Sequence, residues 1–197
     1  NISSKILRVK KSKVIKKNMS EARTNRYEIL TNYCLKNNIL HLFIGHHKDD
    51  YIETFINRKI SGSDFEGLQS INKNIVINKV HILRPLLGFS KKQIYKFNKI
   101  NEIRFMQDPS NTNFKYTRPV IRNYLENIKI SDKKEILNEI KLVKKYLPTY
   151  KQMISEILTK NVIVIEKNKL HFDLNNFKKL HKLIAEKVIK KIYYFFF

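Results

Sequence analysis

The run ILHLFIG, residues 39–45, constrains the fold more than any other stretch of this chain. It is short and apolar, contains Ile and Phe, and ends in glycine, which indicates a buried strand of a parallel sheet. Residues 20–37 before it follow a helical period, with Ser20 as the N-cap. From Asp49 onward, DDYIETFINRKI has its acids in the first turn of a second predicted helix, where the helix dipole favours them. Helix, buried strand and helix in this order predict an open α/β sheet.

The sequence between residue 61 and residue 128 predicts further elements of the same domain. Residues 75–83, IVINKVHIL, are predicted to form a strand pair or one long strand, which Arg84-Pro85 ends. Turn-forming residues predict two loops, and periodicity predicts two helices. The loops are 61–70 and 106–116, and the helices are 90–101, capped by Ser90, and a segment starting at Pro119, because proline suits the first helical position.

The pattern changes after about residue 130, and we place a domain boundary near 128. The predicted domains are therefore 1–128 and 129–197. The second is predicted to be mostly helical, with two helices, a small hairpin turning at Lys167-Asn168, and a long basic amphipathic helix. These segments are 131–147, 148–158, 161–172 and 173–193.

The charge balance predicts an anionic partner. The chain has 40 Lys and Arg against 17 Asp and Glu, a net charge of +23 and a pI near 10.0. Nucleic acid is the commonest partner of such a chain, because neutralising phosphates supplies sequence-independent affinity. An anionic membrane is the weaker alternative, since the positive charge is spread along the chain and no apolar run approaches the roughly 20 residues that span a bilayer. The abundance of Lys, Asn, Ile, Phe and Tyr suggests an AT-rich genome, so mutational bias explains part of the lysine excess.

The single cysteine, Cys34, excludes an internal disulfide and a CxxC pair. This fits a reducing compartment, and Cys34 itself is expected to be a small buried hydrophobe on a helix.

Histidines and acids gather in GHHKDDYIETF, residues 45–55, at the carboxyl end of the predicted strand, where open α/β sheets bind ligands. His46, Asp50 and Glu53 are spaced i, i+4 and i+7, and Asp50 and Glu53 share one helix face even if the helix begins only at Asp49. Three explanations stay open at this point. The cluster forms a metal or nucleotide site, or it recognises a cationic substrate, or its acids only complement the helix dipole.

Two arginine pairs accompany this cluster. Arg23 and Arg26 are spaced i, i+3 on the first predicted helix, and Arg118 and Arg122 are spaced i, i+4 on a later one. Arginine forks suit phosphate and carboxylate groups, although such pairs in basic chains are often solvated surface.

Six motifs, in the same order from residue 22 to residue 122, resemble one known family. They are ARTNRYEIL, GHHKDDYIETF, SGSDFEGL, ILRPLL, DPSN and Y-x-R-x-x-IR. The sequence resembles the tRNA(Ile)-lysidine synthetases of the ATP-pyrophosphatase, or PP-loop, superfamily. A weaker resemblance through residues 126–193 matches the middle helical domain of that family.

The resemblance implies a fold, an activity and roles for particular residues. It implies a Rossmann-like parallel sheet of the PP-loop type, truncated at its N-terminus, in a catalytic domain 1–128, and a mostly helical tRNA-contacting domain 129–197. The implied enzyme uses ATP and Mg²⁺ to adenylate the wobble cytidine of tRNA(Ile) with a CAU anticodon, and then attaches lysine to form lysidine. The implied catalytic residues are Asp50, Glu53 and Arg118, the implied substrate- and nucleotide-binding residues are Arg26, His46 and Arg122, and no protein metal ligand is implied.

The implied partners are the tRNA(Ile) anticodon arm and L-lysine, with no membrane, and a homodimer is one candidate assembly. The implied compartment is the bacterial cytoplasm, or alternatively an organelle stroma or matrix.

The sequence departs from the family in three places. The phosphate-binding S-G-G-x-D-S motif does not occur, and no glycine precedes Gly45. We expect that this reflects missing N-terminal sequence, given the start at Asn, rather than a second chain or gene decay. Pro119 replaces an asparagine, and Ser61 and Asp64 replace the arginine and a glycine of an RGSG loop. Two alternatives to the lysidine-forming ligase stay open: a related PP-loop enzyme that modifies tRNA, such as one that thiolates it, and a non-catalytic RNA-binding remnant.

Overall fold

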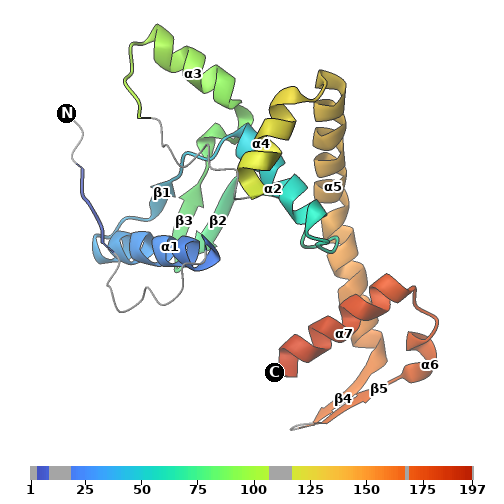
Figure 1. Cartoon of the computed structure of the whole chain (residues 1–197). Helices are drawn as coiled ribbons and strands as arrows, with labels where there is room; N and C mark the ends of the chain where they lie inside the picture. Colours follow the sequence, from blue (N-terminus) through green and yellow to red (C-terminus); the bar gives the residue numbers. More distant parts are fainter. Residues whose placement is uncertain (1–3, 9–18, 107–116, 167–168, 197) are drawn as a thin grey trace. The chain divides into compact units, whose positions relative to one another are not determined.

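The computed structural model describes residues 4–8, 19–106, 117–166 and 169–196 (Figure 1). The chain forms two compact units, which are treated separately below. The first contains residues 1–60 and 70–128, and the second contains residues 61–69 and 129–197. Residues 61–69, which the sequence assigns to the first domain, therefore pack with the second unit. The DPSN motif and the predicted turn at Lys167-Asn168 lie outside the described residues.

The first unit combines helices with a small sheet. Its elements are α1 (Met19–Lys36), β1 (His41–Phe43), α2 (Lys48–Ile60), β2 (Asn74–Ile77), β3 (Val80–Leu83), the 3-10 turn η2 (Pro85–Gly88), α3 (Lys91–Ile100) and α4 (Thr117–Asn127). The predicted order of helix, strand and helix is confirmed for α1, β1 and α2. The cap of α3 is confirmed as well, because Ser90 and Gln93 form a reciprocal capping box.

The sheet of the first unit is mixed, which corrects the prediction of a parallel sheet. Its order is β1-β3-β2, with β1 parallel and β2 antiparallel to β3. Asn78 and Lys79 connect β2 to β3 with φ angles of 47° and 64°. Positive φ at both central residues is typical of the type I′ turn, whose twist suits a two-residue hairpin. Of the two alternatives for residues 75–83, the strand pair is therefore the one that forms.

The core of the first unit lies between α1 and the sheet. Cys34, Val80 and Ile82 are buried together, and half-buried apolar residues such as Tyr27 and Leu42 pack around them. The prediction of a buried Cys34 is confirmed. The prediction that β1 is buried is wrong for its other face, since Phe43 is 67% exposed. Successive side chains of a strand point to opposite faces, and α1 covers only the face that carries Leu42.

The second unit is built around one long helix. Its elements are α5 (Ile130–Asn161), the antiparallel hairpin of β4 (Val162–Glu166) and β5 (Lys169–Phe172), α6 (Leu174–Phe177) and α7 (Lys182–Phe196). The two helices predicted for 131–158 are a single 32-residue helix that contains Pro148. Val143, Leu147 and Ile154 are buried along one face on both sides of the proline, so packing outweighs the local cost of proline.

The long helix predicted for 173–193 is interrupted. Asp173 caps the short helix α6 by accepting from the N–H groups of Asn175 and Asn176. The N–H of Leu183 donates to Nδ1 of His181 (3.4 Å) at the start of α7. Two separate caps thus divide the segment into two helices. Among the described residues, no helix has the length and the apolar character needed to cross a membrane.

Candidate functional site

The candidate site begins where β1 ends and α2 starts. Ile44 N–H donates to Leu83 O (2.9 Å), which extends the pairing of β1 with β3 by one residue. Lys48 N–H then donates to Phe89 O (2.8 Å), just after η2. The GHH segment is therefore held at the carboxyl ends of two parallel strands, which is the edge where open α/β sheets place ligands.

Asp50 completes the first turn of α2. Its Oδ2 accepts from the backbone N–H of His47 (2.9 Å) and lies 3.5 Å from Nε2 of the same histidine. A side chain at the third helical position that reaches back to the N-cap N–H is half of a capping box. Its Oδ1 lies 3.9 Å from Nη2 of Arg122, and the Asp50 side chain keeps 21% of its surface exposed. Asp50 thus caps the helix with one oxygen and keeps the other available for a further donor.

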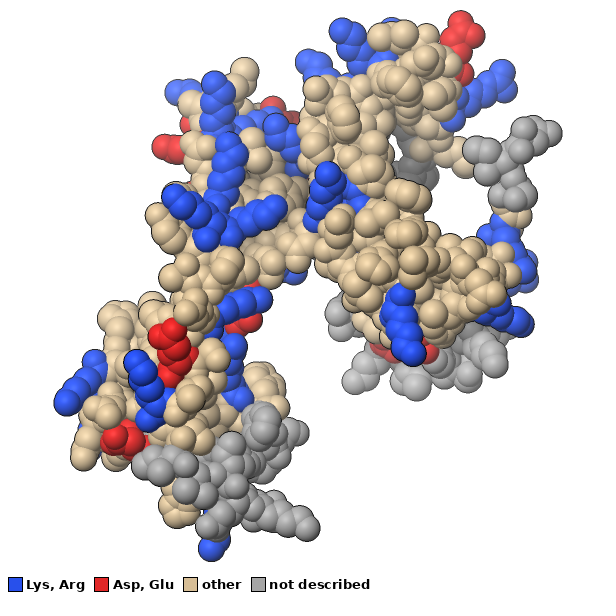
Figure 2. Space-filling view, turned by 180° about the vertical axis from the view of Figure 1, so that it is seen from behind, with Lys and Arg blue, Asp and Glu red and all other residues tan. Residues whose placement is uncertain are grey.

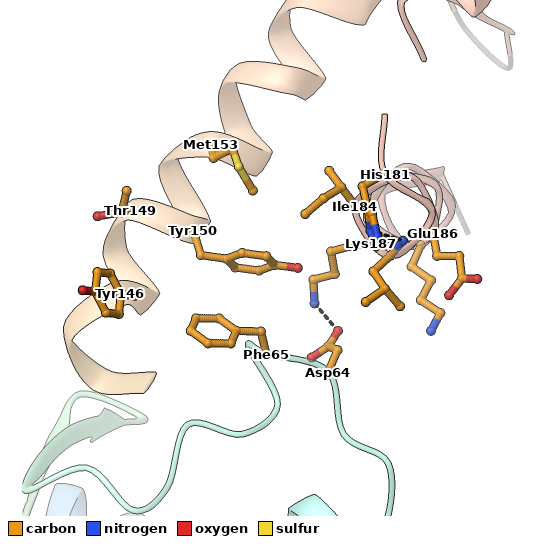
Figure 3. A pocket seen from close by; sticks show the side chains of 12 residues that line it. Asp64, Phe65, Tyr146, Thr149, Tyr150, Met153, His181, Ile184, Glu186 and Lys187 are labelled. Atoms are coloured by element: carbon orange, nitrogen blue, oxygen red, sulfur yellow. Dashed lines mark hydrogen bonds and ion pairs between the residues drawn. The ribbon is translucent and has the colours of Figure 1, made fainter. Parts of the chain in front are cut away.

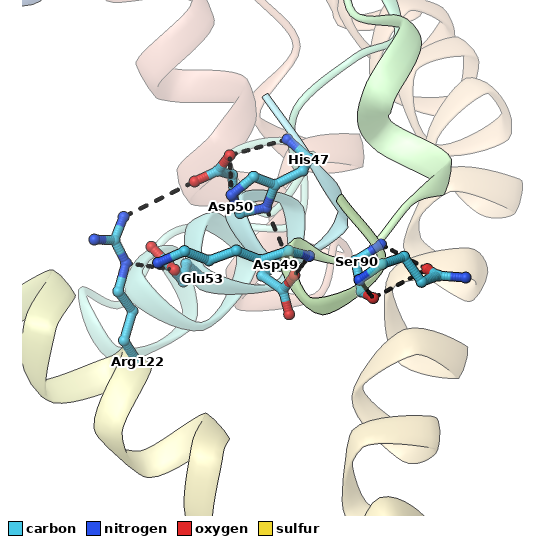
Figure 4. A network of polar contacts seen from close by, with 8 residues as sticks. His47, Asp49, Asp50, Glu53, Ser90 and Arg122 are labelled. Atoms are coloured by element: carbon cyan, nitrogen blue, oxygen red, sulfur yellow. Dashed lines mark hydrogen bonds and ion pairs between the residues drawn. The ribbon is translucent and has the colours of Figure 1, made fainter. Parts of the chain in front are cut away.

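Asp49 joins the starts of two helices. Its Oδ2 accepts from the backbone N–H of Lys91 (2.6 Å), the first residue of α3, and lies 3.6 Å from Nδ1 of His47 (Figure 4). This carboxylate therefore explains how α3 is fixed beside α2, and its position indicates a structural role.

Glu53 is buried and bound to Arg122. Nε of Arg122, on α4, donates to Oε1 of Glu53 (2.7 Å), and Glu53 is 4% exposed. Burial raises the pKa of Glu53, because desolvation disfavours the carboxylate, and the bond from Arg122 opposes that rise. Glu53 therefore pairs with Arg122 and orients its guanidinium, whose Nη2 lies 3.9 Å from Asp50.

His46 lies among several cations. Burial lowers the pKa of His46; Asp50 opposes the change, and the charges of Arg84, Arg23 and Arg118 lower that pKa further. Its Nδ1 is buried and has no hydrogen-bond partner among the described residues. The imidazole therefore lies at a position where positive charge converges and disfavours its protonation.

Arg84, in the ILRPLL motif, is a buried arginine whose positive charge acts on His46. It is 3% exposed, and its guanidinium donates to Asn72 O (2.7 Å) and to the hydroxyl of Tyr27 (3.1 Å). Arg23 donates to the same hydroxyl at 3.4 Å. A buried guanidinium in water-poor surroundings acts at longer range than an exposed one, so Arg84 contributes positive potential at His46 without being open to a ligand.

The structure brings most of the sequence-predicted residues together. Asp50, Glu53 and Arg122 are linked by the contacts above, and Arg118, exposed on α4, lies within electrostatic reach of both His46 and Glu53. Arg26 is exposed on α1, and no contact within the described part of the chain joins it to these residues. Their chemical roles stay predictions.

Sequence reasoning missed His47, Asp49 and Arg84. The first two stand beside predicted residues, and only the fold shows that Asp49 contacts the start of α3 whereas Asp50 caps α2 and approaches Arg122. The signal that could have identified Arg84 is the ILRPLL motif, in which it stands.

Among the described residues, no group of three or more His, Cys, Asp and Glu side chains could hold a metal ion. Asp49, Asp50 and Glu53 each accept from N–H donors at hydrogen-bonding distance. No step proposed below therefore passes through a bound metal.

Comparisons with known proteins agree on the family. The model of the PP-loop domain matches residues 1–129. A tRNA(Ile)-lysidine synthase of Wolbachia sp. subsp. Brugia malayi is 45% identical over 120 residues, which is 61% of this chain and 27% of that protein. The tRNA(Ile)-lysidine synthase of Wolbachia pipientis wMel is 42% identical over 60% of this chain and 27% of its own length.

The resemblance to such proteins extends into the second unit. The tRNA(Ile)-lysidine synthase of Rickettsia typhi is 32% identical over 171 residues, or 86% of this chain and 40% of that protein. The chain thus spans about a quarter to two fifths of the length of these relatives. Because the family model covers well over half of the chain, the chain belongs to the PP-loop domain family.

Proposed function

We propose that this chain serves the ATP-dependent ligation of L-lysine to the wobble cytidine of tRNA(Ile) with a CAU anticodon, through an adenylated base. The observation that carries the proposal is the position of Asp50. Its carboxylate is partly exposed at the carboxyl edge of the sheet, within a surface where cations otherwise predominate. The relatives named tRNA(Ile)-lysidine synthase support the reaction class.

Asp50 suits the ammonium group of a lysine substrate. One of its oxygens is 3.9 Å from Arg122, beyond hydrogen-bonding distance, so it retains capacity to accept from a cation. Glu53, being buried and bound to Arg122, fits a positioning role better than direct contact with the substrate. In this proposal Asp50 binds the amino acid, and Glu53 holds Arg122 against it.

His46 suits the proton transfer that lysine needs. An ammonium group becomes a nucleophile only after it loses a proton, and a neutral imidazole can accept one. We propose that His46 takes this proton before the amine attacks the adenylated base. A C–N bond to the base then forms, the C–O bond to AMP breaks, and AMP leaves with that electron pair.

The exposed arginines suit the anionic partners. Arg118 carries positive charge beside His46 and Glu53, and Arg26 carries it on α1. Guanidinium groups bind phosphates bidentately and stabilise the charge that develops on a leaving phosphate. We assign Arg118 to the adenylate or the anticodon, and Arg26 to the nucleotide. Lys and Arg side chains are spread over the face of the molecule seen in Figure 2, which suits the phosphates of a tRNA.

A second candidate function is RNA binding without catalysis. It is supported by the charge balance of the chain, which has 40 Lys and Arg against 17 Asp and Glu and suits the phosphates of RNA without any catalytic step.

The Asp50→Asn variant tests the proposal in the protein that carries the complete PP-loop domain. Asparagine can still accept from His47 N–H, so the start of α2 is preserved and only the charge is lost. We expect lysine transfer to fall by at least about 100-fold, while tRNA affinity in a filter-binding assay stays within about twofold. Asp132→Asn, on α5, is the control and is expected to keep both properties. Equal losses of transfer and tRNA affinity would reject the role of Asp50. Binding without any transfer in the unsubstituted protein would favour the second candidate.

A further inference from the structure

A cavity of about 470 Å³, open to solvent, lies within the second unit and is lined by residues of α5, α7 and the segment 61–69, with His181 just before α7 (Figure 3). Its volume falls in the range of small-molecule pockets, about 300–1,000 Å³. It contains none of the residues of the candidate site described above.

The cavity has an aromatic and apolar wall. Phe65 and Tyr150 lie with their ring centroids 5.1 Å apart and their planes at 56°, so each ring fixes the other. Met153 and Leu183 add apolar surface and are 37% and 66% exposed. Apolar side chains therefore line a space that is open to solvent, which is unfavourable unless a ligand covers them.

The charges around the cavity are partly neutralised. Nζ of Lys187 lies 2.8 Å from Oδ2 of Asp64 and 2.7 Å from Oε2 of Glu66. Burial alone would lower the pKa of Lys187, but the hydrogen bonds that it donates to both carboxylates raise it. Lys190 also lines the cavity and is exposed. The lining itself carries Asp64 and Glu186 beside Lys187 and Lys190. The second unit as a whole contains 16 lysines, no arginine and nine acids, so its surface favours an anionic ligand.

Polar groups are available beside the apolar wall. Nδ1 of His181 accepts from Leu183 N–H, which leaves Nε2 as the donor of the neutral ring. The hydroxyl groups of Thr149 and Tyr150 belong to the same lining. An apolar wall with a few donors and acceptors at its border suits a flat heterocycle with polar edges.

We propose that this cavity binds an unpaired nucleobase of an RNA strand, stacked against Tyr150, with the adjoining phosphate beside exposed lysines such as Lys190. The proposal rests on the proposed function for its choice of RNA. Proteins read unpaired bases by stacking them on aromatic side chains and by hydrogen bonds to their edges, and lysines beside such a wall hold the backbone. A purely apolar partner would leave the lysines and the hydroxyl groups without a counterpart.

Substitution of Tyr150 tests the stacking. The probe is a single-stranded RNA of about ten nucleotides that carries one 2-aminopurine, and the full chain is titrated while its fluorescence is followed. Tyr150→Leu keeps a smaller apolar side chain and removes the ring, and we expect about tenfold weaker binding with loss of the stacking-induced quenching. Tyr150→Phe keeps the ring and is expected to bind within about twofold of the unsubstituted chain. Equal binding by all three proteins would overturn the proposal.

A second pair of variants covers the case in which Tyr150→Leu fails to fold. Leu183 and Ile189 are both exposed on α7, at 66% and 53%, and only Leu183 lines the cavity. Leu183→Glu is expected to weaken binding of the same RNA by about tenfold, and Ile189→Glu by clearly less, because a carboxylate at the cavity repels the phosphate that it must hold. Equal effects of the two substitutions would overturn the proposal.

The remaining outcomes separate this proposal from competing ones. If the cavity accommodates a second copy of the chain, Leu183→Glu changes the mass measured by sedimentation and leaves RNA affinity unchanged. If the proposed lysine chemistry is wrong but the cavity binds a base, Asp50→Asn retains lysine transfer, whereas Tyr150→Leu still loses the quenching of the probe.

Discussion

Arg122 and Glu53 are 69 positions apart, on α4 and α2, and the guanidinium Nε of one lies 2.7 Å from the carboxylate of the other. Glu53 is buried, whereas the Arg122 side chain is 27% exposed. The carboxylate therefore bears most of the desolvation cost, and the bond compensates for it. This one contact both joins two helices of the first unit and orients the guanidinium beside Asp50.

Removing Arg122 should destabilise the chain through Glu53. Arg122→Ala leaves a buried carboxylate without its donor, and we expect a loss of about 2–3 kcal/mol in the free energy of unfolding. The double variant Arg122→Leu with Glu53→Leu removes both charges and should recover most of that loss. Urea unfolding followed by circular dichroism measures both. A loss below about 1 kcal/mol for Arg122→Ala would show that the pair does not hold α4 to α2.

The short-range elements were the ones that sequence could predict. Ser90 and Gln93 form their capping box within one turn, and Cys34 follows from the period of α1. Such signals need only neighbours in the chain. The Glu53–Arg122 contact could not be predicted, because the arginine fork and the acid lie on different helices and nothing local fixes which partners meet.

At Pro148 the sequence prediction failed for the opposite reason, because packing outweighed a strong local signal. A proline within α5 predicted a helix end, yet the buried positions Leu147 and Ile154 continue the same face across it. Similarly, residues 61–69 were assigned to the first domain because they are close to it in sequence. The contacts of Phe65 with Tyr150, and of Asp64 and Glu66 with Lys187, place them in the second unit.

Replacing Lys79 by glycine should stabilise the β2–β3 hairpin. Lys79 has a φ of 64°, and a side chain in the left-handed region costs roughly 1–2 kcal/mol relative to glycine, less the entropy that glycine adds to the unfolded chain. We expect Lys79→Gly to raise the free energy of unfolding by about 0.5–1 kcal/mol. Lys79→Ala keeps the Cβ and is the control, with no gain expected. Asn78 is left unchanged because its Nδ2 donates to Thr31 Oγ1 (3.1 Å). A destabilised Lys79→Gly variant would contradict the type I′ assignment.

His46 should make stability depend on pH below neutrality. Its pKa is lowered in the folded chain from the ordinary value of 6.5. Between that lowered pKa and 6.5 the unfolded chain binds more protons at this histidine than the folded chain does. The contribution of His46 to the free energy of unfolding is therefore fully present above pH 6.5, and it declines as the pH falls toward the folded pKa. His46→Asn should remove this part of the slope, while His171→Asn, at an exposed histidine of the second unit, should leave it. Urea midpoints at half-unit intervals of pH measure the difference. Identical slopes in the unsubstituted chain and His46→Asn would contradict the shift.

Lys187 should hold residues 61–69 to α7. Oδ2 of Asp64 lies 2.8 Å from the Lys187 ammonium. Lys187→Met leaves the carboxylates of Asp64 and Glu66 without this cation, and we expect a loss of about 1–2 kcal/mol in the free energy of unfolding. Lys182→Met, at an exposed lysine of the same helix, is the control and should change stability little.

The contact of Lys187 with Asp64 and Glu66 predicts a second dependence of stability on pH. It arises from carboxyl groups with lowered pKa values, whereas the first arises from the histidine His46. Burial tends to raise the pKa of Asp64, but the bonds from Lys187 and from Gly67 N–H outweigh it and lower that pKa; the bond from Lys187 is the main reason for the lowered pKa of Glu66. Carboxyls with lowered folded pKa values stabilise the chain fully above their ordinary pKa values, near 4, and lose that contribution as the pH falls through the folded values. Lys187→Met should flatten the stability profile below about pH 4.5, and it should leave the region near pH 6, where His46 acts, unchanged. Flattening in both regions would mean that the substitution disturbs the whole chain rather than this contact.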